Sequence, residues 1–384
     1  MQRETKAVPN RAASGNCAHR ILGEKMDEFN LGDSVKNALE RAMLDRGHVN
    51  VLIAGRTGVG KSTLINAVFQ GDYATTGQGR PVTTGTREIN KPGIPLTILD
   101  TRGLEMGEFG TTLGELRKLL SQRRQELDAR RHIHVAWICV AEDLRRVEEA
   151  ESALAETLAE YVPTLAVVTK ARNDQGFRAE VQRLLPQAKN VLRVRSLREE
   201  MDDGHVLQPS GLVDLVQATA DLVPEGQRRA FVAVQKADMS LKQKNSHMIV
   251  ATSVTAAVAV AYTPIPFSDA VLLIPIQLGM LAAITAIYGL SVSEGFLGTL
   301  LATAVGGAAT TFSGRAIVTG LLKFIPGGGA LVGGTIAAAT AAALTTALGE
   351  GYIGILDKLF EKHRGDPPST DEILQAMNVV KKAW

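Results

Sequence analysis

Two periods of apolar and polar positions alternate along residues 48–223. Short, almost continuously apolar runs are separated by longer stretches in which apolar residues recur every three to four positions, as on one face of a helix. This alternation predicts an α/β domain with a doubly wound, mostly parallel sheet, because strands covered by helices on both faces are apolar throughout. The expected strands are Val49–Ala54, Leu96–Leu99, His134–Val140, Leu165–Val168 and Val191–Val194. The expected helices are Lys61–Phe69, Leu113–Ala129, Leu144–Tyr161, Phe177–Ala188 and Gly211–Leu222.

The last third of the chain has a different pattern. The 102 residues from Met248 to Gly349 hold only four charged side chains, and they are rich in alanine, glycine and threonine. We expect an all-α hydrophobic domain there, with turns at the proline-containing segments 264–266 and 325–329. The uncharged runs within it are Met248–Ser268, Ala270–Ser293, Gly295–Gly314 and Phe324–Gly349.

Two interpretations of this hydrophobic domain are open. About 20 apolar residues cross a bilayer, and Ala270–Leu290 is the best candidate for such a span. Small residues also suit close helix contacts in lipid. The alternative is a tightly packed helical bundle that buries its own core. We favour membrane insertion or deep membrane association, which makes lipid an expected partner.

The remaining segments and the overall composition narrow the possible functions. With 42 Lys and Arg against 40 Asp and Glu, the chain lacks the excess of positive charge expected of a nucleic-acid binder, so DNA is not an expected partner and RNA is disfavoured. Two cysteines exclude a disulfide scaffold and fit a reducing compartment. The expected order is a disordered leader (1–25), a helix (26–47), the α/β domain (48–223), a linker helix (224–247), the hydrophobic domain (248–352) and a helical tail (353–384).

The strongest chemical motif lies between the first expected strand and the helix that follows it. It matches the eight-residue P-loop pattern, in which glycines let main-chain N–H groups surround phosphates at a helix N-terminus. The lysine is expected to reach the β- and γ-phosphates, and the serine hydroxyl to bind Mg²⁺. The residues expected to contact the nucleotide here are Gly55, Arg56, Thr57, Gly58, Val59, Gly60, Lys61, Ser62 and Thr63.

Two further segments are expected to meet this loop. Asp100-Thr101-Arg102-Gly103 follows a buried strand; the Asp100 carboxylate is a candidate to hold Mg²⁺ through water, and the Gly103 N–H to contact the γ-phosphate. A threonine between the two motifs is the candidate to bind Mg²⁺ and to order its loop only with the γ-phosphate present. Thr83 is the first choice and Thr84 the second.

A third segment, Thr169-Lys170, ends the fourth expected strand. In GTPases this position reads [N/T]-K-x-D, where the lysine packs across the base and the aspartate accepts hydrogen bonds from guanine N1–H and its 2-amino group. Here Arg172 occupies the aspartate position, and Asp174 is the candidate substitute if the loop bulges. This departure leaves the choice between guanine and adenine open, with guanine favoured. Ser196 is the only candidate for the next base-binding element.

Together these motifs resemble those of Era-like and septin-like P-loop GTPases, with a G domain of the 50S ribosome-binding GTPase type. The stretch Val51–Asn66 looks most like bacterial membrane-associated GTPases that are distantly similar to immunity-related GTPases. In those proteins a hydrophobic C-terminal domain of unknown function follows the G domain. The resemblance covers about Val49 to Tyr352, and such relatives usually have proline at the position of Arg102.

The resemblance implies binding of GTP and GDP with Mg²⁺, and hydrolysis in which Lys61, Thr83 and Gly103 take part. Ras-like enzymes place a glutamine directly after D-x-x-G to orient water, where this chain has Leu104. Slow intrinsic hydrolysis is therefore the expectation.

The leading hypothesis is a membrane-associated GTPase whose nucleotide state controls the hydrophobic domain or its self-association into a homo-oligomer. We expect it on the cytoplasmic side of a bacterial inner membrane, with a cytoplasmic location as the alternative. A structural, self-assembling membrane protein that barely hydrolyses GTP is the second hypothesis. A soluble Era-like GTPase is the third, although it predicts a basic RNA-binding module that the last third of this chain does not resemble.

Overall fold

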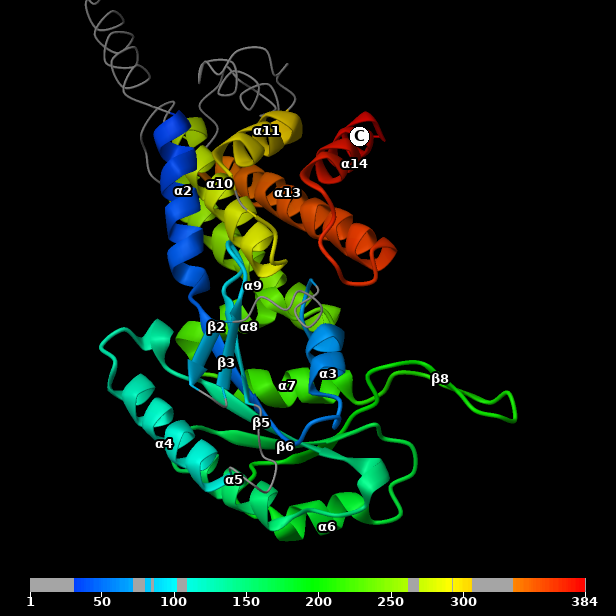
Figure 1. Ribbon diagram of the computed structural model, residues 1–384. Helices are drawn as coiled ribbons and strands as arrows, with labels where there is room; N and C mark the ends of the chain where they lie inside the picture. The colour runs from blue at the N-terminus through cyan, green and yellow to red at the C-terminus, as the bar shows by residue number, and fades with distance from the viewer. Residues whose placement is uncertain are drawn as a thin grey trace, which may run out of the picture.

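The computed structural model describes residues 31–71, 80–83, 86–101, 109–261, 269–291, 293–305 and 334–383. They form a lower α/β domain and an upper helical bundle (Figure 1). Four of the positions or segments named above lie outside these residues: the leader, Gly103, and the two proline-containing turns at 264–266 and 325–329. Thr84 and Leu104 lie outside them as well.

A seven-stranded sheet forms the centre of the α/β domain, in the order β2-β3-β4-β1-β5-β6-β7. The five strands from β4 to β7 in this order are parallel, which confirms the expected doubly wound, mostly parallel fold. Each residue of β1, β4, β5 and β6 is buried, because helices cover both faces. The parallel strands are β1 (Val49–Ala54), β4 (Leu96–Thr101), β5 (Val135–Ala141), β6 (Thr164–Thr169) and β7 (Val191–Arg193).

The other edge of the sheet was not expected. There β2 (Arg80–Thr83) and β3 (Thr86–Asn90) pair antiparallel with each other, and β3 pairs antiparallel with β4. These short strands contain mostly polar residues, so they lack the apolar run that marks a buried strand. A further two-stranded hairpin, β8 (Glu199–Glu200) with β9 (Val206–Leu207), projects from the domain (Figure 1).

Helices on the two faces of the sheet build two separate cores. One face packs against α3 (Lys61–Val68), α7 (Leu212–Leu222) and α8 (Glu225–Val234). The other face packs against α4 (Phe109–Gln125), α5 (Glu149–Ala159) and α6 (Phe177–Leu184). The segment expected to be one linker helix is divided between α8, whose Phe231 is fully buried in the first core, and the start of α9.

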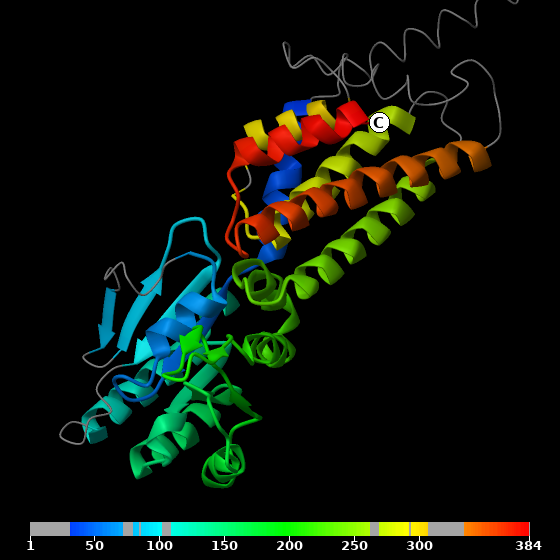
Figure 2. The same ribbon diagram turned by 90° about the vertical axis from the view of Figure 1, so that its right-hand side faces the viewer.

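The helical bundle is built around α10 (Asp269–Ile287), which contacts α2, α9, α11 and α13. Leu278, Leu281 and Ile284 of α10 are fully buried in the core of the bundle. Figure 2 shows α9 and α13 running as long neighbouring rods away from the α/β domain. The surrounding helices are α2 (Leu31–Arg46), α9 (Met239–Ala261), α11 (Glu294–Val305), α13 (Gly334–Lys362) and α14 (Thr370–Ala383).

The expectation of a transmembrane helix at Ala270–Leu290 is not supported. Within the described part of the chain, no helix is both long enough and apolar enough to cross a bilayer. Most of this segment forms α10, whose described side chains pack against other helices of the bundle. A helix surrounded by protein is apolar on all sides, which is also the pattern of a helix surrounded by lipid.

The two domains are joined directly at the C-terminal end of α3. The Gln70 main-chain N–H donates to Val234 O at 2.8 Å, and its side-chain Nε2 donates to Tyr288 O at 3.1 Å. The next N–H, that of Gly71, donates to Asp366 Oδ1 at 3.3 Å, and Asp366 also pairs with Lys236. The helix that follows the P-loop is therefore hydrogen-bonded to α8, to the end of α10 and to the segment between α13 and α14.

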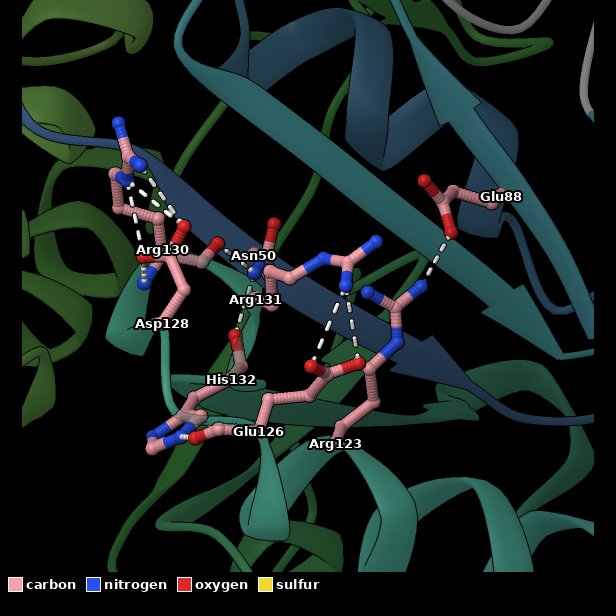
Figure 3. Close-up of polar contacts among 8 residues, drawn as sticks. All are labelled: Asn50, Glu88, Arg123, Glu126, Asp128, Arg130, Arg131 and His132. Atoms are coloured by element: carbon pink, nitrogen blue, oxygen red, sulfur yellow. Dashed lines mark hydrogen bonds and ion pairs between the residues drawn. The ribbon is translucent and has the colours of Figure 1, made fainter.

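The amino-terminal end of β1 is held by a polar network (Figure 3). Asn50 of β1 donates through Nδ2 to Arg130 O at 2.8 Å and to His132 O, which fixes the segment between α4 and β5. The Arg123–Glu88 pair ties α4 to β3. A cavity of about 430 Å³ lies there, lined by Arg46, His48 and Arg130 among others, and contains no residue of the predicted site.

Candidate nucleotide site at the carboxyl edge of the sheet

The P-loop connects the end of β1 to the start of α3, and its glycines Gly55, Gly58 and Gly60 all have positive φ. Gly55 has a φ of +143°, and a Cβ there would lie 2.5 Å from Cys139 O of the neighbouring strand. Gly60 has a φ of +94° and immediately precedes α3. The left-handed region and the close approach to β5 both exclude ordinary side chains, so the loop curves tightly over the end of the sheet.

Lys61 begins α3 and its ammonium lies under the loop. Its Nζ donates to Gly55 O at 2.8 Å and to Arg56 O at 2.9 Å, and the side chain is largely buried. The Arg56 side chain extends outward to form an ion pair with Glu148, the residue before α5. The Lys61 ammonium is thus placed where the main-chain N–H groups at the start of α3 also point.

Asp100 lies beside this loop because β4 is the neighbour of β1. It pairs in register with Ile53 of β1, one residue before the end of each strand, and its side chain is buried. Burial raises the pKa of the nearby Cys139 thiol to about 12, Lys61 acts to lower this pKa and Asp100 acts to raise it. The charges of Lys61 and Asp100 therefore both lie close enough to Cys139 of β5 to affect its thiol.

The donor types of this edge suit Mg²⁺ and phosphate. Ser62 supplies a hydroxyl at the start of α3, Asp100 a carboxylate at the end of β4, and the glycine-rich turn a cradle of N–H groups that a Cβ at Gly55 would disrupt. Mg²⁺ prefers one or two protein oxygens together with phosphate oxygens and water. The described residues contain no cluster of three or more His, Cys, Asp and Glu that could hold a metal ion. Thr83, the other metal candidate, is the last residue of β2.

Thr169 connects β6 to the P-loop, and Lys170 connects it to the segment after β5. The Thr169 hydroxyl donates to Val59 O within the P-loop and lies 3.3 Å from Val140 O of β5. Lys170 adopts a φ of +53°, and its Nζ donates to Asp143 Oδ2 at 3.0 Å. Positive φ is uncommon for a residue with a side chain, and here it turns the chain at the point where β6 ends.

A cavity of about 400 Å³ lies beside these residues. Its lining combines the P-loop and the start of α3, the segment after β5, the end of β6 and the segment after β7, so its walls come from four separate parts of the sequence. Predicted residues in the lining are Gly60, Thr63, Thr169, Lys170 and Ser196. Residues that sequence reasoning assigned no role are Asp143, Arg195, Leu197, Arg198 and Glu199, with Arg172 completing the lining.

Asp174 is placed away from this lining. Its Oδ1 accepts a hydrogen bond from the Arg178 main-chain N–H at 2.8 Å, at the start of α6, and lies 3.4 Å from Arg193 Nε. Arg172 points instead to Glu199, with its Nε 2.8 Å from Glu199 Oε2 and a second bond to Oε1. The ion pair of Arg172 with Glu199 therefore occupies the side of the cavity where Asp174 had been expected.

Two family models match separate parts of the chain. Residues 50–170 match a family described as 50S ribosome-binding GTPase. Residues 227–380 match a family described as a domain of unknown function, DUF697. The first match contains the P-loop, Asp100 and Thr169-Lys170, and the second covers the bundle from α8 to α14.

Similar curated proteins match part of the chain. Magnetosome membrane protein 22 of Magnetospirillum gryphiswaldense is 32% identical over 100 residues, covering 26% of this chain and 51% of that protein. The tRNA modification GTPase MnmE of Desulfotalea psychrophila is 28% identical over 134 residues, covering 34% of this chain and 27% of that protein. Translocase of chloroplast 101 of Physcomitrium patens is 33% identical, covering 23% and 10%. The chain thus spans about half or less of each of these relatives.

Similar solved structures include G domains and small GTP-binding proteins. A probable GTP-binding protein engB is 19% identical with a TM-score of 0.28, covering 38% of this chain and 89% of that one. The G domain of the T. maritima FeoB iron transporter is 19% identical with a TM-score of 0.29, covering 46% and 98%. Aquifex aeolicus Era is 16% identical with a TM-score of 0.31, covering 54% and 66%.

Proposed function

The chain joins a G domain of the P-loop GTPase type to a helical domain of unknown function, and from this premise we propose that it is a GTP-hydrolysing switch. In this proposal GTP and GDP occupy the carboxyl edge of the sheet, and the helical bundle responds to which of them is bound. The observation that carries the proposal is the position of α3, which begins at the phosphate loop and ends in hydrogen bonds to the bundle.

In the GTP-bound state, Lys61 would leave the carbonyls of Gly55 and Arg56 and neutralise charge on the β- and γ-phosphates. Ser62 and Asp100 would hold Mg²⁺, which supplies further charge neutralisation when bound. Leu104 directly follows the D-x-x-G segment and has no polar atom to orient water. Hydrolysis is therefore proposed to be slow without a partner.

The link to the bundle is short and rigid. Helix α3 has 8 residues, so it is about 12 Å long at about 1.5 Å per residue. Gln70, immediately beyond it, donates to both Val234 O and Tyr288 O. Gly289 fits closely against this side chain, because a Cβ there would lie 2.4 Å from Gln70 Oε1 and 2.3 Å from Ala233 O. Because these contacts are close, a shift of α3 on phosphate binding should also move α8 or α10.

Single-turnover cleavage of GTP tests the catalytic half of the proposal. Lys61→Ala should abolish cleavage and weaken binding of a GTP analogue, because the loop loses its cation. Lys118→Ala, on the exposed side of α4, is the matched control and should behave as the unchanged chain does. Absence of cleavage in the unchanged chain at high enzyme concentration would overturn the catalytic half.

Hydrogen exchange tests the coupling half. The amides of α9 and α10 should exchange at different rates with GDP and with a non-hydrolysable GTP analogue. Gln70→Ala should reduce that difference while leaving nucleotide affinity intact, and Gln122→Ala, exposed on α4, should not. Equal exchange of these helices in the two nucleotide states would contradict the coupling.

A second candidate function is assembly on a membrane surface with little hydrolysis. The names of two relatives support it, since one is a magnetosome membrane protein and another a chloroplast translocase. In this proposal the chain associates with lipid, and with further copies of itself, in a nucleotide-dependent manner. Flotation with vesicles of phosphatidylethanolamine and phosphatidylglycerol tests it, and failure to float with either nucleotide would exclude it.

A further inference from the structure

The base-binding end of the candidate site has a chemical gap. Guanine presents two neighbouring donors, N1–H and the 2-amino group, and recognition needs a pair of acceptors opposite them. At the position where resembling GTPases have an aspartate, this chain has Arg172, which is a donor only. Any recognition of guanine must therefore use an acceptor from another part of the fold, and the question rests on the proposed function.

Two carboxylates are in place to fill this gap. Among the described residues that line the cavity of about 400 Å³, the acidic ones are Asp143 and Glu199. Asp174, the substitute expected from the sequence, is not in that lining, and its carboxylate lies at the start of α6 beside Arg193. The choice is therefore between a residue that follows β5 and one that follows β7.

Asp143 already serves the lysine of the pair Thr169-Lys170. Its Oδ2 accepts from Lys170 Nζ at 3.0 Å. An ion pair in this place holds the lysine stem in position beside the cavity, which is the surface on which a planar base would lie. Asp143 is thus best explained as a positioning residue for Lys170.

Glu199 is held in a different way. Arg172 bonds to both of its carboxylate oxygens, with 2.8 Å between Nε and Oε2. A planar guanidinium fixes the carboxylate plane, and each oxygen keeps a second lone pair for another donor. The same contact lowers the pKa of Glu199 from its ordinary value, so the group stays ionised at neutral pH. Arg172 stands at the motif position where resembling GTPases have an aspartate. It therefore holds the Glu199 carboxylate in a fixed orientation next to that position.

We propose that Glu199, positioned by Arg172, reads the N1–H and 2-amino edge of guanine in this protein. The recognising carboxylate then comes from the segment after β7 and not from the segment after β6. Thr169 ties the end of β6 to the P-loop, and the Arg172–Glu199 pair ties this carboxylate to the segment that directly follows β6. The base specificity of the switch follows from the Arg172–Glu199 pair.

The experiment measures competition of GDP, xanthosine diphosphate and ADP against a fluorescent GDP analogue on the full chain. Xanthine has a 2-oxo group where guanine has a 2-amino group, so a carboxylate repels it and an amide can donate to it. Glu199→Gln should weaken GDP binding about 10- to 100-fold, since a hydrogen bond to a charged group contributes about 1.5–3 kcal/mol and a tenfold change is about 1.4 kcal/mol. The same variant should bind xanthosine diphosphate more tightly than the unchanged chain does, which also shows that it is folded.

Matched carboxylate-to-amide variants distinguish the alternatives. Asp174→Asn and Asp143→Asn should keep the preference for GDP over xanthosine diphosphate. Arg172→Ala should weaken GDP binding without reversing that preference. A preference for GDP that survives in Glu199→Gln would overturn the inference while the proposed function stands, provided that Lys61→Ala weakens GDP binding. A reversal in Asp143→Asn or Asp174→Asn would also overturn it. Equal binding of GDP and ADP by the unchanged chain would overturn both.

Discussion

Lys242 is a fully buried lysine at the junction of three helices. Its Nζ donates to Val232 O at 2.8 Å, to Ala233 O at 2.6 Å and to Ile287 O at 3.2 Å. The final carbonyls of a helix have no partner within that helix. Lys242, near the start of α9, therefore supplies donors to the C-terminal ends of both α8 and α10, next to the Gln70 contacts that join the two domains.

The perturbation we consider is Lys242→Met, which keeps the length of the side chain and removes its donors. The neighbouring carbonyls at these helix ends have main-chain donors of their own: Phe231 O accepts from Gln235, Val234 O from Gln70, Ile284 O from Tyr288, and Ala286 O from Gly289. The three carbonyls bonded by Lys242 would be left buried without this donor. Methionine cannot replace it, so the cost falls on the helix ends.

The expected magnitude is the difference between two effects. Each buried carbonyl left unpaired costs about 1–3 kcal/mol, or about 3–9 kcal/mol for the three. Removing a desolvated ammonium returns several kcal/mol of this. We therefore expect the free energy of unfolding of the bundle to fall by about 2–4 kcal/mol.

Urea unfolding followed by circular dichroism, together with hydrogen exchange of α9 and α10, measures this loss. Lys244→Met is the control, because Lys244 lies two residues further along the same helix and is exposed. Burial also lowers the pKa of Lys242 below its ordinary value. The unfolded chain then binds more protons between the lowered and the ordinary pKa, so bundle stability should rise with pH in that window and lose this rise in Lys242→Met. A midpoint equal to that of the control, or higher than that of the unchanged chain, would refute the reasoning.

Three other predictions concern the α/β domain. Gly55→Ala should abolish nucleotide binding in a titration with a fluorescent analogue, because its Cβ would lie 2.5 Å from Cys139 O. Gly58→Ala is strained by a φ of +79° but would meet nothing within 4 Å, so it should retain more affinity. With the other cysteine replaced by serine, Cys139 should resist iodoacetamide at about pH 8 until the chain unfolds, since burial raises the pKa of its thiol to about 12; labelling of the folded protein by mass spectrometry would contradict this. Burial lowers the pKa of His134, which accepts from the Asn50 N–H at 2.9 Å, to about 4, so its contribution to stability is present above the unfolded value of 6.5 and is lost as pH falls toward 4. Unfolding curves at successive pH values should show that loss, and His134→Gln should reduce it.

Local patterns account for the parts of the site that were foreseen. The P-loop is one continuous segment between a strand and a helix, so its shape follows from residues close in sequence. Asp100 and Thr169 each stand at the end of a buried strand, and the carboxyl ends of parallel strands meet at one edge. That geometry brings them to the P-loop without further information.

The cavity lining could not be foreseen in the same way. Asp143 and Glu199 follow different strands, and no motif marks either of them. Sheet order and the Arg172 ion pair bring them to the cavity, and both depend on contacts between distant segments. Asp174 illustrates the reverse case, since its place in the sequence suggested the base whereas its carboxylate bonds at the start of α6.

The sequence by itself determined the alternating α/β domain, its phosphate loop and the existence of a nearly uncharged helical region. These features depend on the period of apolar residues and on neighbours along the chain. Only the tertiary structure decided what surrounds the uncharged helices. A helix that is apolar on all sides, such as α10, can be surrounded by lipid or by protein. Its pattern of apolar residues is the same in both cases. The packing of α2, α9, α11 and α13 around it, and the Lys242 and Gln70 bonds at its end, specify protein surroundings for its described residues.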